Sequence, residues 1–182
     1  NNQLTSLDVS NNTALTNLNC RTNQLTSLGV SNNTELTILN CYNNQLTSLD
    51  VSNNTALTNL NCRTNQLTSL GVSNNTELTI LNCYNNQLTS LDVSNNTALT
   101  NLSCDDNQLT SLDVRNGNND NVTFFNASTN PDLYCILVDD ISYSTTNWTN
   151  IDPASAFVTN EAACAELSLG DTAFELDVTI YP

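Results

Sequence analysis

Cysteine has the most versatile chemistry of the side chains in this sequence, and five of the seven cysteines recur every 21 residues. They are Cys20, Cys41, Cys62, Cys83 and Cys104. Such a series can form a metal or redox ladder, or it can supply small apolar residues to a core. One Cys per repeat, with no His and no Cys-x-x-Cys pair, does not match metal-site spacing. We therefore interpret the five as buried core residues and expect no metal and no cofactor.

The sequence lacks the side chains that usually carry acid–base catalysis at neutral pH. It has no His or Lys, and its three basic residues are Arg21, Arg63 and Arg115. A pair of carboxylates can act on a glycoside, but the acids of the repeats are spaced along what should be a flat sheet. The four glycines form no phosphate-binding loop. We predict that the protein is not an enzyme.

The formal net charge of −15 is unevenly distributed. Residues 1–104 carry five acids and two arginines, a net charge of −3, whereas residues 105–182 carry thirteen acids and one arginine, a net charge of −12. Without a basic patch to neutralise phosphates, nucleic acid and anionic membranes are unsuitable partners; a cationic partner or a divalent cation fits the charge better. No apolar stretch reaches the ~18–20 residues of a membrane helix, so no membrane insertion is expected.

An internal repeat organises residues 1 to about 115. Residues 1–42 and 43–84 are identical, and each copy contains two 21-residue units. Each unit has two halves with one pattern, written as Leu15-x-x-Leu18-x-Cys20-x-x-Asn23-x-Leu25 and Leu25-x-x-Leu28-x-Val30-x-x-Asn33-x-x-Leu36. Alternation of apolar and polar residues predicts a short strand with one buried face in each half.

The asparagines that follow each strand predict bends, because their side chains bond the backbone groups that a bend leaves unpaired. A half-repeat of 10 or 11 residues has room for a strand and a turn but not for a normal helix. Each unit is therefore one coil with two strands, and stacked coils form two parallel sheets. We expect both asparagine columns to lie inside: Asn23, Asn44, Asn65, Asn86, Asn107 and Asn12, Asn33, Asn54, Asn75, Asn96.

The signature Leu-x-x-Leu-x-Cys-x-x-Asn-x-Leu resembles that of leucine-rich repeats, and its nested 10+11 spacing resembles the short, 21-residue bacterial class. This resemblance implies an all-β-leaning, right-handed solenoid with two parallel sheets, no convex helices and a C-terminal cap. The predicted divisions are leucine-rich repeats in 1–115 (five full units and a partial sixth), a last coil and cap in 116–164, and a linker with the start of a truncated sorting domain in 165–182. Because the chain begins in mid-repeat, we expect the true N-terminus upstream.

Outward positions on the first predicted sheet form the candidate binding face. Arg and Tyr often anchor interfaces, and here they alternate beside an isoleucine column and an asparagine column. The candidate residues are Arg21, Tyr42, Arg63, Tyr84, Ile38, Ile80, Asn19, Asn40, Asn61 and Asn82. The alternative is that duplication copied tolerated surface variants. The outward residues of the second sheet are small and polar, with Gly29 and Gly71 replacing Asp in alternate coils.

Residues 131–164 resemble the C-terminal cap of surface leucine-rich-repeat proteins from bacteria with type IX secretion. The shared features are Cys135 followed by an apolar run and Asp139-Asp140, then Asn147-Trp148, and a closing Cys164. With this resemblance we expect a Cys135–Cys164 disulfide, which would close the cap loop of a secreted protein; two unpaired thiols are the alternative. Asp139 and Asp140 lack a Ca²⁺-type ligand loop, so solvated acids are the preferred interpretation.

The final Val178-Thr-Ile-Tyr-Pro182 is similar to the opening strand of the sorting domain of type IX substrates. Asp171-Thr172-Ala173 resembles the O-glycosylation acceptor triplet of the same bacteria, which makes Thr172 a candidate site. These resemblances imply a secreted, cell-surface protein of a Gram-negative bacterium that engages the secretion machinery.

The sequence favours a binding or adhesion module over other functions, because a solenoid offers a long rigid face to an extended partner. The partner class is a protein or a surface polysaccharide. A structural spacer or secretion passenger with variable repeat number is the second hypothesis, and the identical 42-residue copies motivate it. An ice-binding surface is the third, suggested by regular polar columns, although alternating Arg and Tyr are unsuited to a regular lattice.

Overall fold

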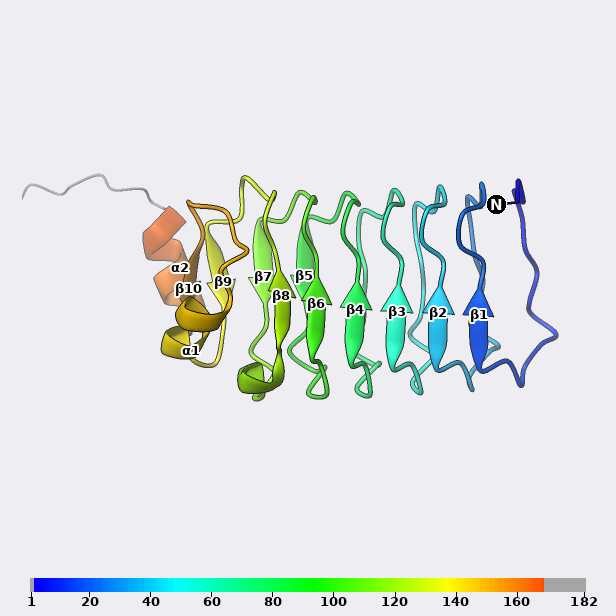
Figure 1. The fold of residues 1–182 in the computed structure, drawn as a ribbon, viewed down its shortest axis with the longest axis horizontal. Helices are drawn as coiled ribbons and strands as arrows, with labels where there is room; N and C mark the ends of the chain where they lie inside the picture. Colours follow the sequence, from blue (N-terminus) through cyan, green and yellow to red (C-terminus); the bar gives the residue numbers. More distant parts are fainter. Residues whose placement is uncertain (1, 169–182) are drawn as a thin grey trace, which may run out of the picture.

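A computed structural model describes residues 2–168 as a single stack of coils closed at one end by two short helices (Figure 1). The first sheet is parallel and six-stranded, in the order β1-β2-β3-β4-β6-β8. Its strands are β1 (Asn17–Asn19), β2 (Ile38–Asn40), β3 (Asn59–Asn61), β4 (Ile80–Asn82), β6 (Asn101–Ser103) and β8 (Phe124–Asn126). The predicted strand in the first half of each coil is confirmed.

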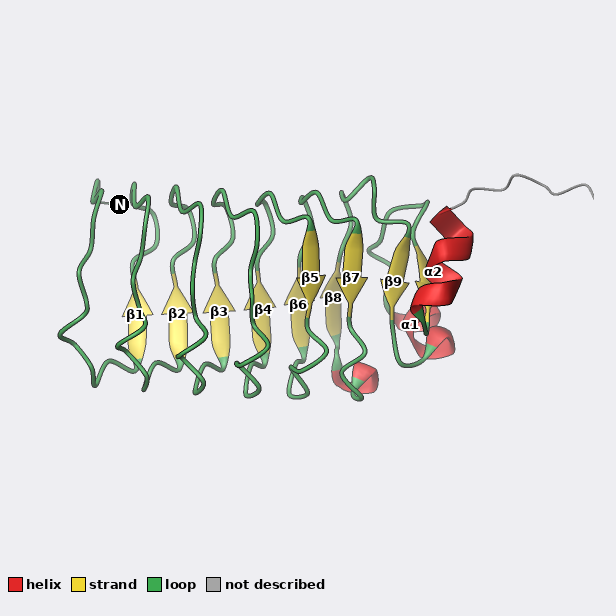
Figure 2. Cartoon of the chain, turned by 180° about the vertical axis from the view of Figure 1, so that it is seen from behind, coloured by secondary structure: helices red, strands yellow, loops and turns green. Residues whose placement is uncertain are grey.

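A second parallel sheet lies on the opposite side of the coils, as Figure 2 shows from behind. Its strands, in the order β10-β9-β7-β5, are β5 (Ser90–Asp92), β7 (Ser111–Asp113), β9 (Cys135–Leu137) and β10 (Ala156–Val158). The prediction of two strands in every coil is wrong for the first four coils. There the second half is extended without strand pairing apart from one bridge, between Asp8 and Gly29.

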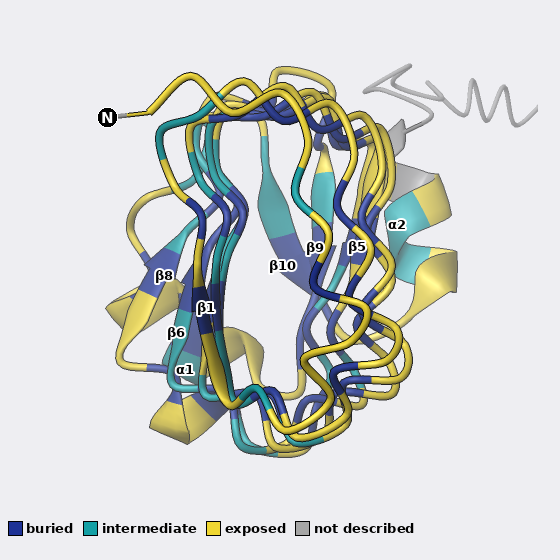
Figure 3. Ribbon diagram, turned by 90° about the vertical axis from the view of Figure 1, so that its right-hand side faces the viewer, coloured by how far each residue is buried: buried dark blue, intermediate teal, exposed yellow. Residues whose placement is uncertain are grey.

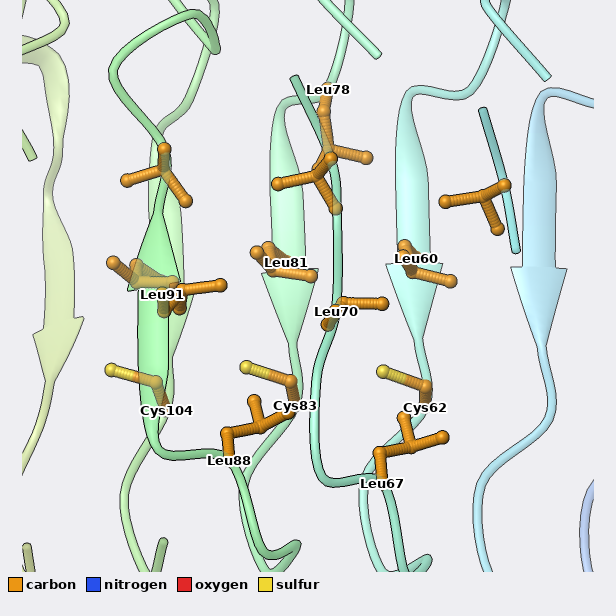
Figure 4. Close-up of a cluster of buried hydrophobic side chains, with 14 of the residues drawn as sticks. Leu60, Cys62, Leu67, Leu70, Leu78, Leu81, Cys83, Leu88, Leu91 and Cys104 are labelled. Carbon is orange, nitrogen blue, oxygen red and sulfur yellow. The ribbon is translucent and has the colours of Figure 1, made fainter. Parts of the chain in front are cut away.

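The core lies between the two sides of the coils, which the view down the stack shows facing one another (Figure 3). Each strand of the array places its central leucine inside, and pairing in register repeats this leucine at every coil: Leu18 with Leu39, Leu39 with Leu60, Leu60 with Leu81. The five cysteines form the predicted buried column. Cys62, Cys83 and Cys104 lie in a row beside the stacked leucines (Figure 4). A slip of one residue would turn this apolar set outward, so burial fixes the register.

The first asparagine column holds consecutive coils together. Asn65 donates through Nδ2 to the carbonyl oxygens of Cys62 at 2.9 Å and of Cys41, in the preceding coil, at 3.2 Å. Its Oδ1 accepts from the backbone N–H of Leu46 at 3.0 Å. The same set of bonds recurs at Asn44, Asn86, Asn107 and Asn130. The column is buried as predicted, except that Asn23 in the first full coil is half-buried.

The second asparagine column is buried from Asn33 onward, whereas Asn12 is exposed because no coil precedes it in the stack. Asn54 donates to the carbonyl oxygens of Val30 at 3.0 Å and Asn33 at 2.8 Å. Its buried Oδ1 has no hydrogen-bond partner in the described part of the chain. This column therefore satisfies carbonyl groups only, and the first column carries the more complete set of bonds.

The residue before each asparagine of the first column has a left-handed backbone. The φ values of Thr22, Asn43, Thr64, Asn85, Asp106 and Thr129 lie between 53° and 59°. Asn and Asp tolerate this region, but a β-branched residue is strained there. The coil closes its bend at these positions whichever residue is present, because the buried asparagine that follows fixes the backbone.

Two glycines provide an internal test of backbone effects. A Cβ built on Gly71 meets nothing within 4 Å, and the backbone of Gly71 lies outside the positive-φ region; Gly117 has the same free space but a φ of +74°. Gly71→Ala is expected to stabilise the fold by about 0.4–1 kcal/mol by restricting the unfolded chain. Gly117→Ala is expected to destabilise it by about 1–2 kcal/mol, the cost of a left-handed alanine. Urea unfolding of both variants checks the opposite signs.

The cap closes the core with aromatic rings and two helices, α1 (Ile141–Asn147) and α2 (Glu161–Ser168), after a 3₁₀ turn, η1 (Asn119–Asn121), in the glycine- and asparagine-rich insertion. Trp148 stacks on Phe125 with ring centroids 4.3 Å apart, and its Nε1 donates to the carbonyl oxygen of Val122 at 3.0 Å. Phe157 packs edge-on against both rings. Neither helix of the described residues is long and apolar enough to cross a membrane.

A disulfide and an ion-pair cluster fasten α2 to the coils. Cys135 of β9 is bonded to Cys164 of α2, as the sequence predicts. Arg115 contacts Asp113 at 2.6 Å and Glu161 of α2 at 2.5 Å. Burial opposes ionisation of Asp113, but the hydrogen bonds and charge of Arg115 outweigh this effect and lower the Asp113 pKa.

Candidate binding face

The first sheet presents its outward side chains in rungs, one rung for each coil. A rung consists of the residues at the three outward positions of the coil, and two kinds of rung alternate. The first four rungs are Asn17-Asn19-Arg21, Ile38-Asn40-Tyr42, Asn59-Asn61-Arg63 and Ile80-Asn82-Tyr84, and we call these twelve residues the ladder face. The strands that carry them face the viewer in Figure 1. Backbone bonds continue past the strand ends, so the last position of each rung is held as firmly as the first two: Thr22 N donates to Tyr42 O at 2.9 Å.

Arginine and tyrosine stack on one another along the edge of the ladder face. The Arg63 guanidinium carbon lies 4.3 Å from the centroid of the Tyr42 ring and 5.5 Å from that of Tyr84. Arg21 lies 5.7 Å from the Tyr42 centroid. Each contact is within the ~6 Å range of cation–π attraction. The alternating column is therefore a continuous cation–π stack in which the rings hold the guanidinium groups in place.

The guanidinium N–H groups of Arg21 and Arg63 have no hydrogen-bond acceptor and no carboxylate partner among residues 2–168. Arg115, in contrast, donates from Nε and Nη2 to Asp113 and from Nη2 to Glu161. An arginine whose faces are covered by rings and whose edges are free presents a rigid fork of donors, which suits an anionic oxygen pair.

Two asparagines in the middle of the ladder face have buried amide oxygens. The Oδ1 atoms of Asn61 and Asn82 are covered from solvent in the free protein and have no hydrogen-bond partner among the described residues. A buried polar atom without a partner costs stability. Because solvent does not reach these oxygens, they are not available as acceptors to a ligand on the ladder face.

The column formed by the first residue of each rung is apolar at every second rung, and it continues toward the cap in β8. Ile80 is 37% exposed, Ile38 is half-buried, and Phe124 of β8 is 46% exposed. Ile80 and Phe124 flank the shorter Asn101, which leaves a hollow of about 190 Å³. Phe124 was not among the residues predicted for the face; its pairing with Asn101 places it in the isoleucine column.

The cysteine column beneath the ladder face consists of five free, buried thiols. Each inner thiol lies against a carbonyl oxygen of the next coil, as Cys62 Sγ does with Asn82 O at 3.7 Å. Burial raises the pKa of Cys20 to about 11 and raises the pKa values of the other four thiols well above their usual value. In the described residues no group of three or more His, Cys, Asp or Glu side chains is placed to hold a metal ion.

These thiols are expected to resist alkylation while the protein is folded. The reactive species is the thiolate, and with a pKa of about 11 only ~0.1% of Cys20 is ionised at pH 8. Iodoacetamide at pH 8, followed by mass spectrometry, should leave the native protein unmodified and label all five after denaturation. Cys20, the least buried, should react first as the pH rises. Labelling of Cys62 before Cys20 would contradict the buried column.

The two adjacent acids of the cap, Asp139 and Asp140, are exposed, and each also accepts a hydrogen bond from the backbone. Asp139 Oδ2 accepts from the backbone N–H of Gly117 at 2.9 Å. Asp140 Oδ1 accepts from Tyr143 N at 3.0 Å and so caps the N-terminus of α1. The sequence signal for the second role was present, since Asp at the position before a helix is a common cap. Thr172 lies outside the described residues.

The structure thus brings all ten predicted face residues onto one surface and shows the stacking that joins four of them. No family model and no curated protein matches this sequence. Solved structures do match. The functional domain of InlJ from Listeria monocytogenes, described as including a cysteine ladder, is 34% identical with a TM-score of 0.67 over 85% of this chain. An internalin, inlF, from the same species is 28% identical with a TM-score of 0.55 over 71%.

The Leptospira interrogans leucine-rich-repeat protein LIC12759 is 23% identical with a TM-score of 0.65 over 91% of this chain, a likeness of fold alone. The chain spans 36%, 44% and 38% of the InlJ, Leptospira and inlF structures, so it corresponds to less than half of each. The sequence-based prediction of the fold is confirmed. This chain has the fold of the bacterial leucine-rich-repeat internalins, a parallel β-solenoid with two parallel sheets.

Proposed function

We propose that this chain is a binding or adhesion module that works outside the cell and contacts its partner through the ladder face. The observation that carries the proposal is the cation–π stack of Arg21, Tyr42, Arg63 and Tyr84, whose guanidinium edges have no acceptor within the described chain. Arg and Tyr are the residue types most enriched at interface hot spots. The rings and guanidinium groups are already ordered, so binding would cost little side-chain entropy.

The similarity to internalin structures supports the same class of function, because the matched portion is the solenoid that carries the face. A flat sheet built from stacked coils presents one continuous surface, which suits an extended partner. The hollow between Ile80 and Phe124 adds an apolar contact at one end.

An extracellular location is supported by the Cys135–Cys164 disulfide, since disulfides persist in oxidising compartments. The other five cysteines are buried and so are protected from exchange with it. The more specific proposal of export by type IX secretion from a Gram-negative bacterium rests on the sequence resemblances of residues 131–164 and 178–182. Fractionation of a producing cell tests it: retention of the protein inside the cell would reject it.

Binding to a panel of immobilised host-surface and biofilm polymers tests the face. The double variant Tyr42→Ala/Tyr84→Ala should bind about thirtyfold or more weakly than the unmodified chain, because hot-spot truncation costs about 2 kcal/mol or more. Both the ring contacts and the support of Arg63 are lost in this variant. Surface plasmon resonance against the polymers retained by the unmodified chain gives the affinities.

Tyr134→Ala is the matched control, because Tyr134 is 46% exposed but belongs to the cap. It should bind like the unmodified chain. Equal affinities of the double variant and this control would remove the ladder face from the proposed function.

A further inference from the structure

The two kinds of rung on the ladder face differ in chemistry, and their alternation has a fixed period. The rungs Asn17-Asn19-Arg21 and Asn59-Asn61-Arg63 are polar and cationic; the rungs Ile38-Asn40-Tyr42 and Ile80-Asn82-Tyr84 are apolar at both ends. Neighbouring strands are about 4.8 Å apart, so each kind of rung recurs about every 10 Å along the stack. A partner that uses the whole face should repeat its own chemistry at the same interval.

The cationic rungs require anionic groups, and these groups must be sparse. Arg21 and Arg63 are the only cations in residues 1–104, and neither has an anionic partner among the described residues. A nucleic acid duplex carries about one charge per 1.7 Å, far more than two arginines can neutralise. One anionic group per ~10 Å matches the two guanidinium groups one for one.

The local charge around the face permits such a partner despite the net charge of −15. Asp8, Asp50 and Asp92 lie on the opposite side of the coils, about 10 Å or more away, where salt screens them. Glu35 and Glu77 occupy turns before the isoleucine column, at the edge opposite the arginines.

Asp105 marks the end of the anion-binding part of the face. It follows Tyr84 in the arginine–tyrosine column, and its carboxylate accepts from Ser103 Oγ at 2.6 Å. A carboxylate in this position repels an anionic group on the fifth rung. The part of the sheet that can bind an anionic polymer is therefore limited to the four rungs of the ladder face.

We propose that the ladder face binds a linear acidic polysaccharide in which a uronic acid alternates with a neutral sugar. An extended β-linked pyranose chain advances by about one strand spacing per ring, so one disaccharide covers one pair of rungs. The uronate carboxylates pair with the guanidinium edges of Arg21 and Arg63. The neutral sugar rings pack against the tyrosine rungs, on Ile38 with Tyr42 and on Ile80 with Tyr84.

This inference rests on the proposed function and names the partner class for the same face. An acidic protein segment is the other polymer that supplies carboxylates and donors. The sugar chain is favoured because its period matches the rungs, whereas an extended strand presents alternate side chains at ~7 Å intervals.

The test is calorimetric titration of the chain with a hyaluronan octasaccharide, which alternates a uronate with a neutral N-acetylated sugar. The matched ligand is the same octasaccharide with its carboxyl groups reduced to alcohols. We expect binding of the first and about tenfold or more weaker binding of the second. Arg63→Gln should cause a similar loss for the first ligand only, and Arg63→Lys should recover part of it, because lysine keeps the charge but not the planar fork.

Two further ligands separate the sources of the anionic charge. An oligogalacturonate of equal length carries a carboxylate on every ring and should bind no better than hyaluronan; tighter binding would overturn the two-rung period. Poly-glutamate should bind more weakly than hyaluronan, and equal or tighter binding would assign the face to acidic protein segments.

Failure of both uronate polymers to bind would overturn the inference. In that case, loss of polymer-panel binding in Tyr42→Ala/Tyr84→Ala would still support the ladder face as the contact surface. Normal panel binding by that double variant would reject both proposals. Circular dichroism of each variant checks that its fold is retained.

Discussion

Asn65→Ala is expected to lower the free energy of unfolding by about 3 kcal/mol or more, because each buried group left without a partner costs about 1–3 kcal/mol. The substitution removes the acceptor of Leu46 N and the donor to the carbonyl oxygens of Cys41 and Cys62. These groups belong to two adjacent coils, so the effect should reach beyond one repeat. Urea unfolding followed by circular dichroism measures the change.

Asn53→Ala is the control for this prediction. Asn53 is exposed and makes a single side-chain bond, to Ser31 O at 3.3 Å. Its loss should change stability by about 0.5 kcal/mol or less. If Asn65→Ala costs no more than Asn53→Ala, the asparagine column does not hold the coils together.

Trp148→Ala is expected to destabilise the cap by about 3–5 kcal/mol, the usual cost of truncating a buried aromatic residue. The ring is 2% exposed and stacks on Phe125, the apolar residue that closes the last coil of the first sheet. Its removal exposes the end of the solenoid core. Capping units normally keep such an end from water, so lower solubility should accompany the loss. Thermal unfolding by differential scanning calorimetry measures the stability.

Trp148→Phe separates packing from hydrogen bonding at this site. The smaller ring keeps most of the stacking on Phe125 but loses the bond from Nε1 to Val122 O. It should cost about 1–3 kcal/mol, the price of an unpaired buried carbonyl and a small void. A loss as large as that of Trp148→Ala would show that the hydrogen bond, and not the packing, closes the cap.

The solenoid could be predicted because the same pattern of buried and bend-forming residues recurs in every repeat. Leu18, Cys20 and Asn23 recur at one spacing, and only a strand followed by a bend turns all three positions toward the core. The sequence pattern could not show that the second halves of the first four coils lack strand pairing. The residues there alternate as strand residues do, but pairing depends on small backbone rotations that side-chain alternation does not encode.

The left-handed residues were also beyond sequence reasoning. Thr22 and Thr64 have φ values of 57° and 53° although threonine disfavours that region. Asn43 and Asn85 occupy the equivalent position in the other units and are better suited to it. The duplication therefore contains both a favourable and a strained solution to one bend, and only coordinates show that the position requires a left-handed residue.

For the candidate face, too, some features could be predicted from the sequence and others required the coordinates. Alternation of Arg and Tyr could be read directly from the sequence, and outward positions follow from strand periodicity. That Arg63 lies between two rings, with its donor edges free, depends on side-chain conformations. The unpartnered Oδ1 atoms of Asn61 and Asn82 likewise depend on packing around each amide. These two features, the stacking of Arg63 and the packing of the amides, define the chemistry of the face more closely than its exposed residues alone.

The identical 42-residue copies make a seamless deletion possible. Removing 43–84 joins Tyr42 to Asn85, which reproduces the native junction between Tyr84 and Asn85. The first sheet would lose two strands but keep its register, because every remaining pair has an equivalent in the intact chain. The shortened chain should therefore fold, and its cysteines should stay protected from alkylation.

Affinity of this shortened chain tests the ladder face most directly, because the deletion removes one arginine rung and one tyrosine rung and leaves the cap untouched. Surface plasmon resonance against the polymer that the intact chain retains should show affinity lower by about tenfold or more, as expected when a periodic partner loses one of two equivalent contacts. Unchanged affinity in a folded, shortened chain would contradict a binding face and would identify the repeats as a spacer.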